Sequence, residues 1–437
     1  PKASTRVDCT TSATSCTYDE EMTNFANWFT YYRTRMQTMK TSASFAFGTL
    51  SNNYRLGYIS INNATGTDFL NLDRFELTHR EAWFTKLTSA YPSGVTPLRG
   101  ALSRVGRLFG GRLNGQSLNG STVVDPMQYS CQQNFTLLST DGYWNESGTP
   151  VRLDGSTAVG DADNALPRPL LDGTTTSNTL ADVAAYYYDT DLRTGTTGVG
   201  LCASATGGDL CENNVPVTDV DVARHQHMTT FTLGLGVSGY MLFDEAYATA
   251  QSGDYFNVKN GTPANPAGGV CTWQASGACN WPVPVNNSPP NIDDLWHAAV
   301  NGRGTYFSAK DPAALYSGLS AALAAIEKRR GAAAAATTSN PNISASDNYV
   351  FISNFNAGFD QWTGELTGQR IDTETGAVST SASDWSAKTQ LDAATSRTIY
   401  TFDAGSTTTK LKSFEWGNLT STEQSFFQTA WITSPGR

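Results

Sequence analysis

Apolar positions along the chain follow two alternating periods, one typical of helices and one typical of strands. Residues 20–41 carry apolar side chains at three- and four-residue steps behind the acidic run 19–21, which predicts an amphipathic helix. These apolar side chains are Met22, Phe25, Trp28, Phe29, Tyr32 and Met36. A strand is predicted next, at residues 54–62.

The same alternation of strand and helix continues to residue 328. Residues 134–138 form a short apolar run that ends in Ser/Thr/Asp-Gly turn chemistry, as is typical of a buried parallel strand. Helices are also predicted at 74–89, 97–110, 178–190, 291–300 and 312–328, and strands at 228–236 and 304–308. Such an order predicts an α/β fold, a doubly wound domain with a mostly parallel sheet, over residues 1–330.

A change of composition after residue 330 predicts a domain boundary. Residues 331–346 are small and polar and include a helix-ending proline, which indicates a linker. Beyond it, 347–437 alternates strand residues with turn chemistry, for example strand residues at 349–352 and 362–367 and a turn at 372–376. We therefore expect a small C-terminal β segment.

Composition narrows the classes of partner. The chain has 437 residues, of which 39% are hydrophobic and 16% charged, so it can bury a large core. With 29 basic against 39 acidic residues, it offers no broad basic surface for the counterion release that drives nucleic-acid binding. Nucleic acid is therefore not an expected partner. No run of about 18 apolar residues occurs, so a transmembrane segment is not expected either.

Six of the seven cysteines fall into close pairs inside Gly/Ser/Thr-rich stretches, where short bridges could pin a loop. The pairs are Cys9/Cys16, Cys202/Cys211 and Cys271/Cys279. They favour disulfide bonds and an oxidising compartment, since no C-x-x-C occurs and the four histidines make no zinc spacing with them. Cys131 is left over and is either a buried apolar thiol or the partner of a cysteine outside this sequence.

Two oxygen-bearing side chains stand at the ends of predicted elements. Thr96 lies in a loop just before a helix, and Asp141 follows the strand at 134–138, where ligands bind in parallel α/β sheets. A threonine hydroxyl and an aspartate carboxylate suit Mg²⁺ or Ca²⁺, which prefer oxygen ligands. Taken singly, Thr96-Pro97 is also an N-cap followed by proline at N1, and Asp141-Gly142 is also a simple turn.

Other motifs are weaker. Residues 234–239 read G-x-G-x-x-G after a strand, but no second parallel strand follows, so the glycines indicate a tight strand exit. Residues 161–164 begin like a calcium loop, although Leu166 stands where an EF-hand has glycine and Asp172 where it has glutamate, which favours a turn. No G-x-S-x-G, H-E-x-x-H or Walker A motif occurs, so an enzyme is not expected.

The order of elements resembles a von Willebrand factor A domain over residues 20–328. Residues 54–62 resemble its second strand, and the loops containing Thr96 and Asp141 resemble those that bear its metal-binding threonine and aspartate. The family's metal site begins with an Asp-x-Ser-x-Ser loop after the first strand, and none occurs before the helix at 20–41. We therefore expect the first strand to be absent, and only Thr96 and Asp141 carry over as ligands.

More narrowly, several strings resemble the PilY/PilC-type tip adhesins of bacterial type IV pili. They are residues 131–136, 140–145, 178–184 with 186–188, and 294–299. The resemblance implies a non-enzymatic exported protein that passes through the periplasm to the pilus tip, outer membrane or cell surface. It would support pilus assembly, surface attachment and twitching motility, possess a divalent cation site, and contact minor pilins, other pilus proteins and a host or abiotic surface receptor.

The resemblance extends to the C-terminal segment, which is similar to the entry of the family's β-propeller. Since the 91 residues after 346 are too few to close a propeller, we expect the chain to be truncated at both ends. Tyr143 and Trp144, directly after the metal aspartate, are candidates for a partner-binding aromatic surface or for the core. Two other functions stay open: a metal-independent assembly factor that primes pilus polymerisation, and an exported hydrolase.

Overall fold

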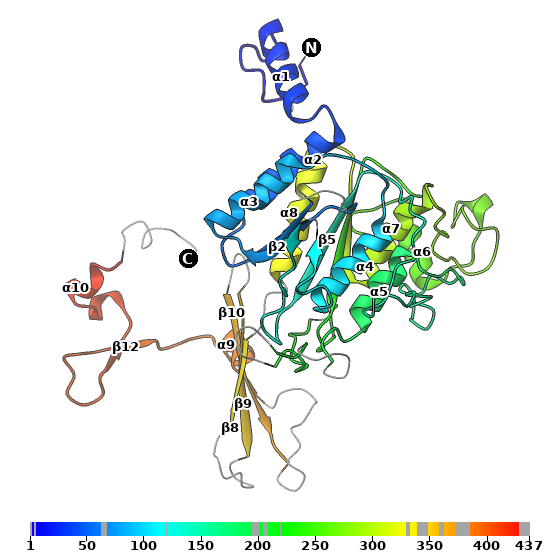
Figure 1. Ribbon diagram of the computed structural model, residues 1–437. Helices are drawn as coiled ribbons and strands as arrows, with labels where there is room; N and C mark the ends of the chain where they lie inside the picture. Colours follow the sequence, from blue (N-terminus) through cyan, green and yellow to red (C-terminus); the bar gives the residue numbers. More distant parts are fainter. Residues whose placement is uncertain are drawn as a thin grey trace. The chain divides into compact units, whose positions relative to one another are not determined.

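The structure is a computed structural model that divides into two compact units, Pro1–Arg330 and Gly331–Arg437 (Figure 1). The described residues are 2–3, 6–62, 68–118, 120–194, 201–203, 209–218, 220–328, 333–338, 348–357, 362–372 and 385–427.

A parallel sheet of three strands lies at the centre of the first unit. The strands are β5 (Asn134–Thr140), β6 (Met228–Leu235) and β7 (Arg303–Ala309), in the order β5-β6-β7. All eight residues of β6 are buried, as is usual for a middle strand covered on both faces. Successive side chains point to opposite faces, so Leu137 and Leu138 join different core clusters.

Helices cover both faces of this sheet (Figure 1). On one side lie α4 (Leu98–Phe109), α5 (Leu180–Asp189) and α7 (Pro290–Asn301). On the other lie α2 (Arg35–Gly48), α3 (Leu77–Ser89) and α8 (Pro312–Lys328). The prediction of an α/β fold with a parallel sheet is thus confirmed.

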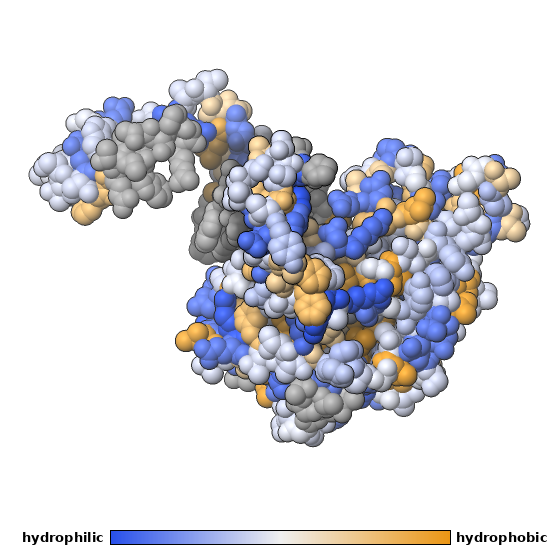
Figure 2. Space-filling model, turned by 90° about the horizontal axis from the view of Figure 1, so that it is seen from above, coloured by the Kyte–Doolittle hydropathy of each residue, from blue (hydrophilic) through white to orange (hydrophobic). Residues whose placement is uncertain are grey.

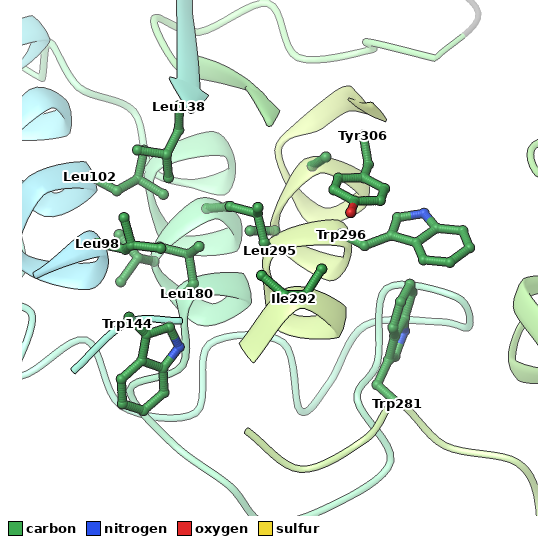
Figure 3. Packing of buried hydrophobic residues seen from close by; sticks show 14 of the residues in the cluster. Leu98, Leu102, Leu138, Trp144, Leu180, Trp281, Ile292, Leu295, Trp296 and Tyr306 are labelled. Atoms are coloured by element: carbon green, nitrogen blue, oxygen red, sulfur yellow. The ribbon is translucent and has the colours of Figure 1, made fainter. Parts of the chain in front are cut away.

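The larger core lies between the sheet and the side bearing α4, α5 and α7 (Figure 3). Leu98 and Leu102 of α4 meet Leu138 of β5 and Leu180 of α5, and burial of each such side chain is worth about 1.5–3 kcal/mol. A group of stacked and edge-on aromatic rings closes one end of this core. It comprises Phe243, Tyr247, Tyr255 of α6 (Asp254–Asn260), Trp281, Trp296 and Tyr306.

The helix predicted at residues 20–41 is in fact two helices, α1 (Tyr18–Tyr31) and α2. The chain breaks because Thr34 caps a new helix, its hydroxyl accepting a hydrogen bond from the Gln37 backbone N–H at 3.1 Å. No residue of α1 is buried among the described residues, so its apolar side chains are exposed. The apolar period therefore predicted the helix correctly, and the structure shows that its apolar face is exposed.

Two short strand pairs and a 3-10 turn also belong to the first unit. Strands β1 (Arg55–Ile59) and β2 (Phe69–Arg74) form an antiparallel pair, and β2 was not predicted. Since β2 continues to Arg74, the helix predicted from residue 74 begins only at Leu77. Strands β3 (Ser117–Leu118) and β4 (Ser121–Thr122) form a two-residue ladder, and a 3-10 turn lies at Pro266–Gly268.

Each expected cysteine pair is bridged. The disulfides are Cys9–Cys16, Cys202–Cys211 and Cys271–Cys279. The remaining thiol, Cys131, is exposed, so the alternative of a buried apolar thiol is wrong.

The second unit is mainly antiparallel β structure. Its sheet has the order β11-β10-β9-β8 and consists of β8 (Ala333–Thr338), β9 (Tyr349–Ala357), β10 (Trp362–Arg370) and β11 (Trp385–Ser386). The smaller elements α9 (Ala387–Ala393), β12 (Tyr400–Phe402), β13 (Leu411–Ser413), a 3-10 turn at Trp416–Asn418 and α10 (Ser421–Gln424) follow.

Part of the predicted linker at 331–346 is a β-strand in the structure. Residues 333–338 form β8, paired with β9, whereas 331–332 and 339–346 lie outside the described residues. The turn predicted at 372–376 also lies outside them, except for Asp372.

The surface carries apolar side chains scattered among hydrophilic ones on the face shown in Figure 2. Within the described part of the chain, no helix combines the length and the apolar character needed to cross a bilayer.

Candidate metal and partner-binding site

A cavity of about 550 Å³ opens beside the carboxyl ends of β5 and β6, where ligands bind in parallel α/β folds. Its lining is mostly polar and comes from five separate segments of the first unit. The lining residues are Arg35, Thr96, Asp141, Gly142, Tyr143, Asn145, Gly236, Val237, Ser238 and Asn287.

Thr96 and Asp141, 45 residues apart in sequence, both line this cavity. Asn145 ties their loops together, because its side-chain Oδ1 accepts the Thr96 backbone N–H at 2.5 Å and its own N–H donates to the Thr96 carbonyl at 3.2 Å. The turn after β5 is closed by the Thr140 hydroxyl, which bonds to the N–H and the carbonyl of Gly142. The two predicted oxygen ligands therefore face one cavity from loops that are held in place.

The hydroxyl of Thr96 does not cap α4. Pro97 occupies the N-cap position and provides no side-chain cap, so the alternative of Thr96 as N-cap is wrong. Glu146 serves instead, its carboxylate accepting the backbone N–H groups of Arg99 at 2.7 Å and Gly100 at 3.1 Å. No hydrogen bond among the described residues engages the Thr96 hydroxyl, which leaves it available at the cavity.

Arg35, the first residue of α2, brings a positive charge to the same place. One of its guanidinium nitrogens donates to the Asp141 carbonyl at 2.8 Å and lies 3.9 Å from the Asp141 carboxylate. Both side chains are more than half exposed, so the ion pair is weak. A hard cation could use the Asp141 carboxylate and the Thr96 hydroxyl, but two protein oxygens hold a divalent ion poorly without further ligands.

The glycine-rich loop after β6 forms another wall of the cavity. Gly236 has a φ of +66°, which allows the chain to turn sharply out of the strand. The loop continues to an anchor in which the Asp293 carboxylate accepts the N–H groups of Tyr240 and Met241, at 2.7 and 3.0 Å. The glycines thus make a tight strand exit, the reading that the sequence favoured over a dinucleotide fingerprint.

Trp144 is a core residue and not a partner-binding one. Its ring is 5% exposed and lies beneath the Arg99 guanidinium, and its indole N–H donates to Asp294 at 3.2 Å. Asp294 also accepts the first two backbone N–H groups of α5, and burial raises its pKa to about 6. The sequence-based hypothesis of an aromatic contact surface is therefore wrong for Trp144, whereas half-buried Tyr143 lines the cavity.

Sequence reasoning missed three features of this site. Arg35, Ser238 and Asn287 come from distant segments, and no local pattern marks them as neighbours of Asp141. Asn145 lies within the segment 140–145 that resembles the pilus family, and Glu146 follows it directly. The sequence did not show that their hydrogen-bond partners are at residues 96–100.

The chain is similar to known proteins of bacterial type IV pili. It is 32% identical over 432 residues to the type IV pilus biogenesis factor PilY1 of Pseudomonas aeruginosa strain UCBPP-PA14, and 31% identical over 474 residues to PilY1 of strain PAK. These alignments cover 93% and 95% of this chain. The chain is a PilY1-type sequence. The recognition of a PilY/PilC-type protein from its sequence strings is thereby confirmed.

The similarity covers only part of each PilY1 protein. The chain spans 35% and 36% of the length of these two relatives, about a third. No protein-family model matches the chain, and no solved structure gives a significant match.

Proposed function

We propose that this chain is the part of an exported type IV pilus biogenesis factor that supports pilus assembly, surface attachment and twitching motility at the pilus tip or outer membrane. The PilY1-type relatives carry this proposal, because the similarity extends over nearly the whole chain. The three disulfides support an oxidising location such as the periplasm or cell surface. Minor pilins, other pilus proteins and a host or abiotic receptor are the partners that this role requires.

For the first unit we propose a von Willebrand factor A-like domain. Its support is the parallel order of β5, β6 and β7 with helices on both faces, together with the position of Thr96 and Asp141 beside the strand ends. For the second unit we propose the start of a β-propeller, since its antiparallel sheet has four strands, as one propeller blade does.

We further propose that the cavity holds Mg²⁺ or Ca²⁺ through the Thr96 hydroxyl and the Asp141 carboxylate, with further oxygen ligands completing the shell. The bound cation would act as a Lewis acid toward an acidic side chain of the partner. Asn145 fixes the Thr96 loop, and Tyr143 provides an aromatic wall at the site where the partner would enter.

The second candidate is a metal-independent assembly factor, and Arg35 favours it. The guanidinium already supplies Asp141 with a positive neighbour, so the cavity could receive an acidic partner without a cation. In that case Arg35, and not a metal, would bind the partner's carboxylate.

Calorimetric titration of Mg²⁺ and Ca²⁺ into the chelator-treated chain distinguishes the metal-dependent candidate from the metal-independent one. We expect the heat assigned to this cavity to vanish in Asp141→Ala and to persist in Asp73→Ala, an exposed aspartate on β2 outside the cavity. Identical titrations of Asp141→Ala and the wild type would contradict metal binding here. Pilus number and surface attachment should then be measured for Arg35→Ala in the full-length protein, where the metal-independent candidate requires a loss.

A further inference from the structure

Three aspartates that do not line the cavity come together in the first unit. Each of Asp161, Asp163 and Asp182 offers a carboxylate oxygen, and these oxygens lie within 4.8 Å of one another. Asp161 and Asp163 belong to the loop that leads toward α5, whereas Asp182 is in the first turn of α5 itself. None of the three lines the cavity that contains Thr96 and Asp141.

The surrounding structure holds these carboxylates rigidly. Asp182 forms a capping box with Thr179, whose N–H and hydroxyl both donate to its Oδ2 at 2.8 Å. The other oxygen of Asp182 accepts the Ala162 N–H at 2.7 Å, which fastens the Asp161–Asp163 loop to the helix. From the end of α7, the Asn301 amide donates to Asp163 Oδ2 at 2.8 Å.

Several buried oxygens in this cluster lack a donor. Asp163 and Asp182 are each 1% exposed and Asn301 is fully buried. Among the described residues, Oδ1 of Asp161, Oδ1 of Asp163 and Oδ1 of Asn301 make no hydrogen bond. A buried acceptor without a donor costs about 1–3 kcal/mol, so three in one place need an explanation. The Asn301 amide nitrogen donates to Asp163 Oδ2 and so orients this carboxylate, while Asp163 Oδ1, on a side chain only 1% exposed, has no partner.

The negative charge of the cluster is also uncompensated. Within the described part of the chain, no lysine or arginine forms an ion pair with these three carboxylates. His297 Nε2 lies 3.7 Å from Asp163 but donates its proton to the Leu170 carbonyl at 2.7 Å. Burial, and after it the charges of Asp182 and Asp172, raise the pKa of Asp163 to about 8.

We propose that Asp161, Asp163 and Asp182 bind a structural Ca²⁺ ion and that Asn301 positions Asp163 for this role. An all-oxygen set of carboxylates selects a hard cation, and Ca²⁺ accepts six to eight oxygens in flexible geometry, so waters and bidentate carboxylates can complete the shell. Asp161 is only partly buried and neighbours exposed Asn164, which provides a path for the ion from solvent. The ion would fasten the 161–182 segment to α5 and α7.

This site differs from the EF-hand that the sequence suggested and did not support. An EF-hand draws its ligands from a single loop of 12 residues, in which Leu166 and Asp172 are unsuitable. Here the third carboxylate comes from α5 and the orienting amide from α7, which no loop motif could reveal. The proposal does not depend on the pilus function.

Titration of Ca²⁺ into the whole chelator-treated chain, by calorimetry and by thermal unfolding, tests the proposal. We expect Ca²⁺ to bind the wild type and raise its unfolding temperature by several degrees, because the ion binds the folded state alone. Asp163→Asn and Asp161→Asn should each lose this binding, whereas Asp141→Ala, in the other cavity, should keep it. Asn301→Ala should weaken binding about 10- to 100-fold, as loss of a ligand-orienting partner does.

The Asn variants also carry their own folding control. In chelator, Asp163→Asn should unfold at or above the wild-type temperature, because an amide cannot ionise, whereas burial and the charges of Asp182 and Asp172 oppose ionisation of the Asp163 carboxyl. Should Asp163→Asn fail to fold, the partly exposed Asp161→Asn still tests a ligand of the same ion. Because the cavity at Asp141 is itself a proposed Ca²⁺ site, the two Asn substitutions are also made in the Asp141→Ala protein. Absence of Ca²⁺ binding to the wild type, binding retained in both Asn variants of the Asp141→Ala protein, or loss of all binding in Asp141→Ala alone would each overturn the proposal.

Discussion

At the scale of single residues, buried carboxylates stabilise the first unit by capping the amino ends of helices to which they do not belong. Glu146 closes the amino end of α4, and Asp294 closes that of α5, although neither belongs to the helix it caps. Such carboxylates complement the partial positive charge of unpaired backbone N–H groups. Each therefore fixes a helix and the loop beside the cavity at once.

Removal of one such carboxylate should be costly. We predict that Glu146→Ala lowers the free energy of unfolding of the first unit by about 3 kcal/mol, because it leaves the Arg99 Nε and two helix N–H groups without their acceptor at a largely buried position. Denaturant unfolding followed by tryptophan fluorescence measures this change. Glu76→Ala is the control, since Glu76 stands at the N-cap of α3 without a side-chain cap, and it should change stability by less than about 0.5 kcal/mol. Equal effects of the two variants would refute the role of Glu146.

At the scale of elements, the approach of α4 to α5 depends on a residue without a side chain. A Cβ added at Gly106 of α4 would overlap the ring of Tyr187, which is fully buried and donates its hydroxyl proton to the Val151 carbonyl at 2.7 Å. The packing distance of these two helices, and hence the position of the loops that precede them, is set by this glycine.

We predict that Gly106→Ala destabilises the first unit by about 1–3 kcal/mol, because the added methyl group forces the ring or the helix to move. The matched control is Gly48→Ala at the end of α2, where an added Cβ meets nothing within 4 Å, and its effect should stay within about 0.5 kcal/mol. The measurement is the midpoint of thermal or urea unfolding. A Gly106→Ala protein as stable as the wild type would show that α4 and α5 can separate freely.

At the scale of the whole molecule, disulfides fasten the long insertions of an otherwise ordinary α/β unit. The three bridges differ in their access to solvent, because Cys271 and Cys279 are both fully buried, whereas Cys202 and Cys211 are partly exposed. Thiol–disulfide exchange requires a thiolate to reach a sulfur atom, so burial protects a bridge from attack.

We predict that a mild thiol reductant applied to the folded protein opens Cys202–Cys211 before Cys271–Cys279. Alkylation followed by mass spectrometry measures the order, and the exposed Cys131 should be modified even without reductant. Under denaturing conditions all three bridges should open together. Earlier opening of Cys271–Cys279 in the folded protein would contradict the burial seen in the core.

The sequence by itself determined the elements and the family. Period and turn chemistry predicted nearly all the long helices and strands, because these signals depend on neighbours within a few residues, and Thr96 and Asp141 were found from the ends of predicted elements. The close spacing of the six cysteines likewise limited their pairing. Local patterns also located α1 as an amphipathic helix, but they could not show that its apolar face is exposed.

Only the tertiary structure decided which side chains meet. It buried Trp144 beneath Arg99, brought Arg35 to Asp141, and replaced the expected cap at Thr96 with Glu146. It also brought Asp182 of α5 and Asn301 of α7 to Asp163, which the sequence had placed in a simple turn. The physical reason is that the strength of a charge, a hydrogen bond or a metal ligand depends on distance and burial, which the order of residues in the chain does not specify.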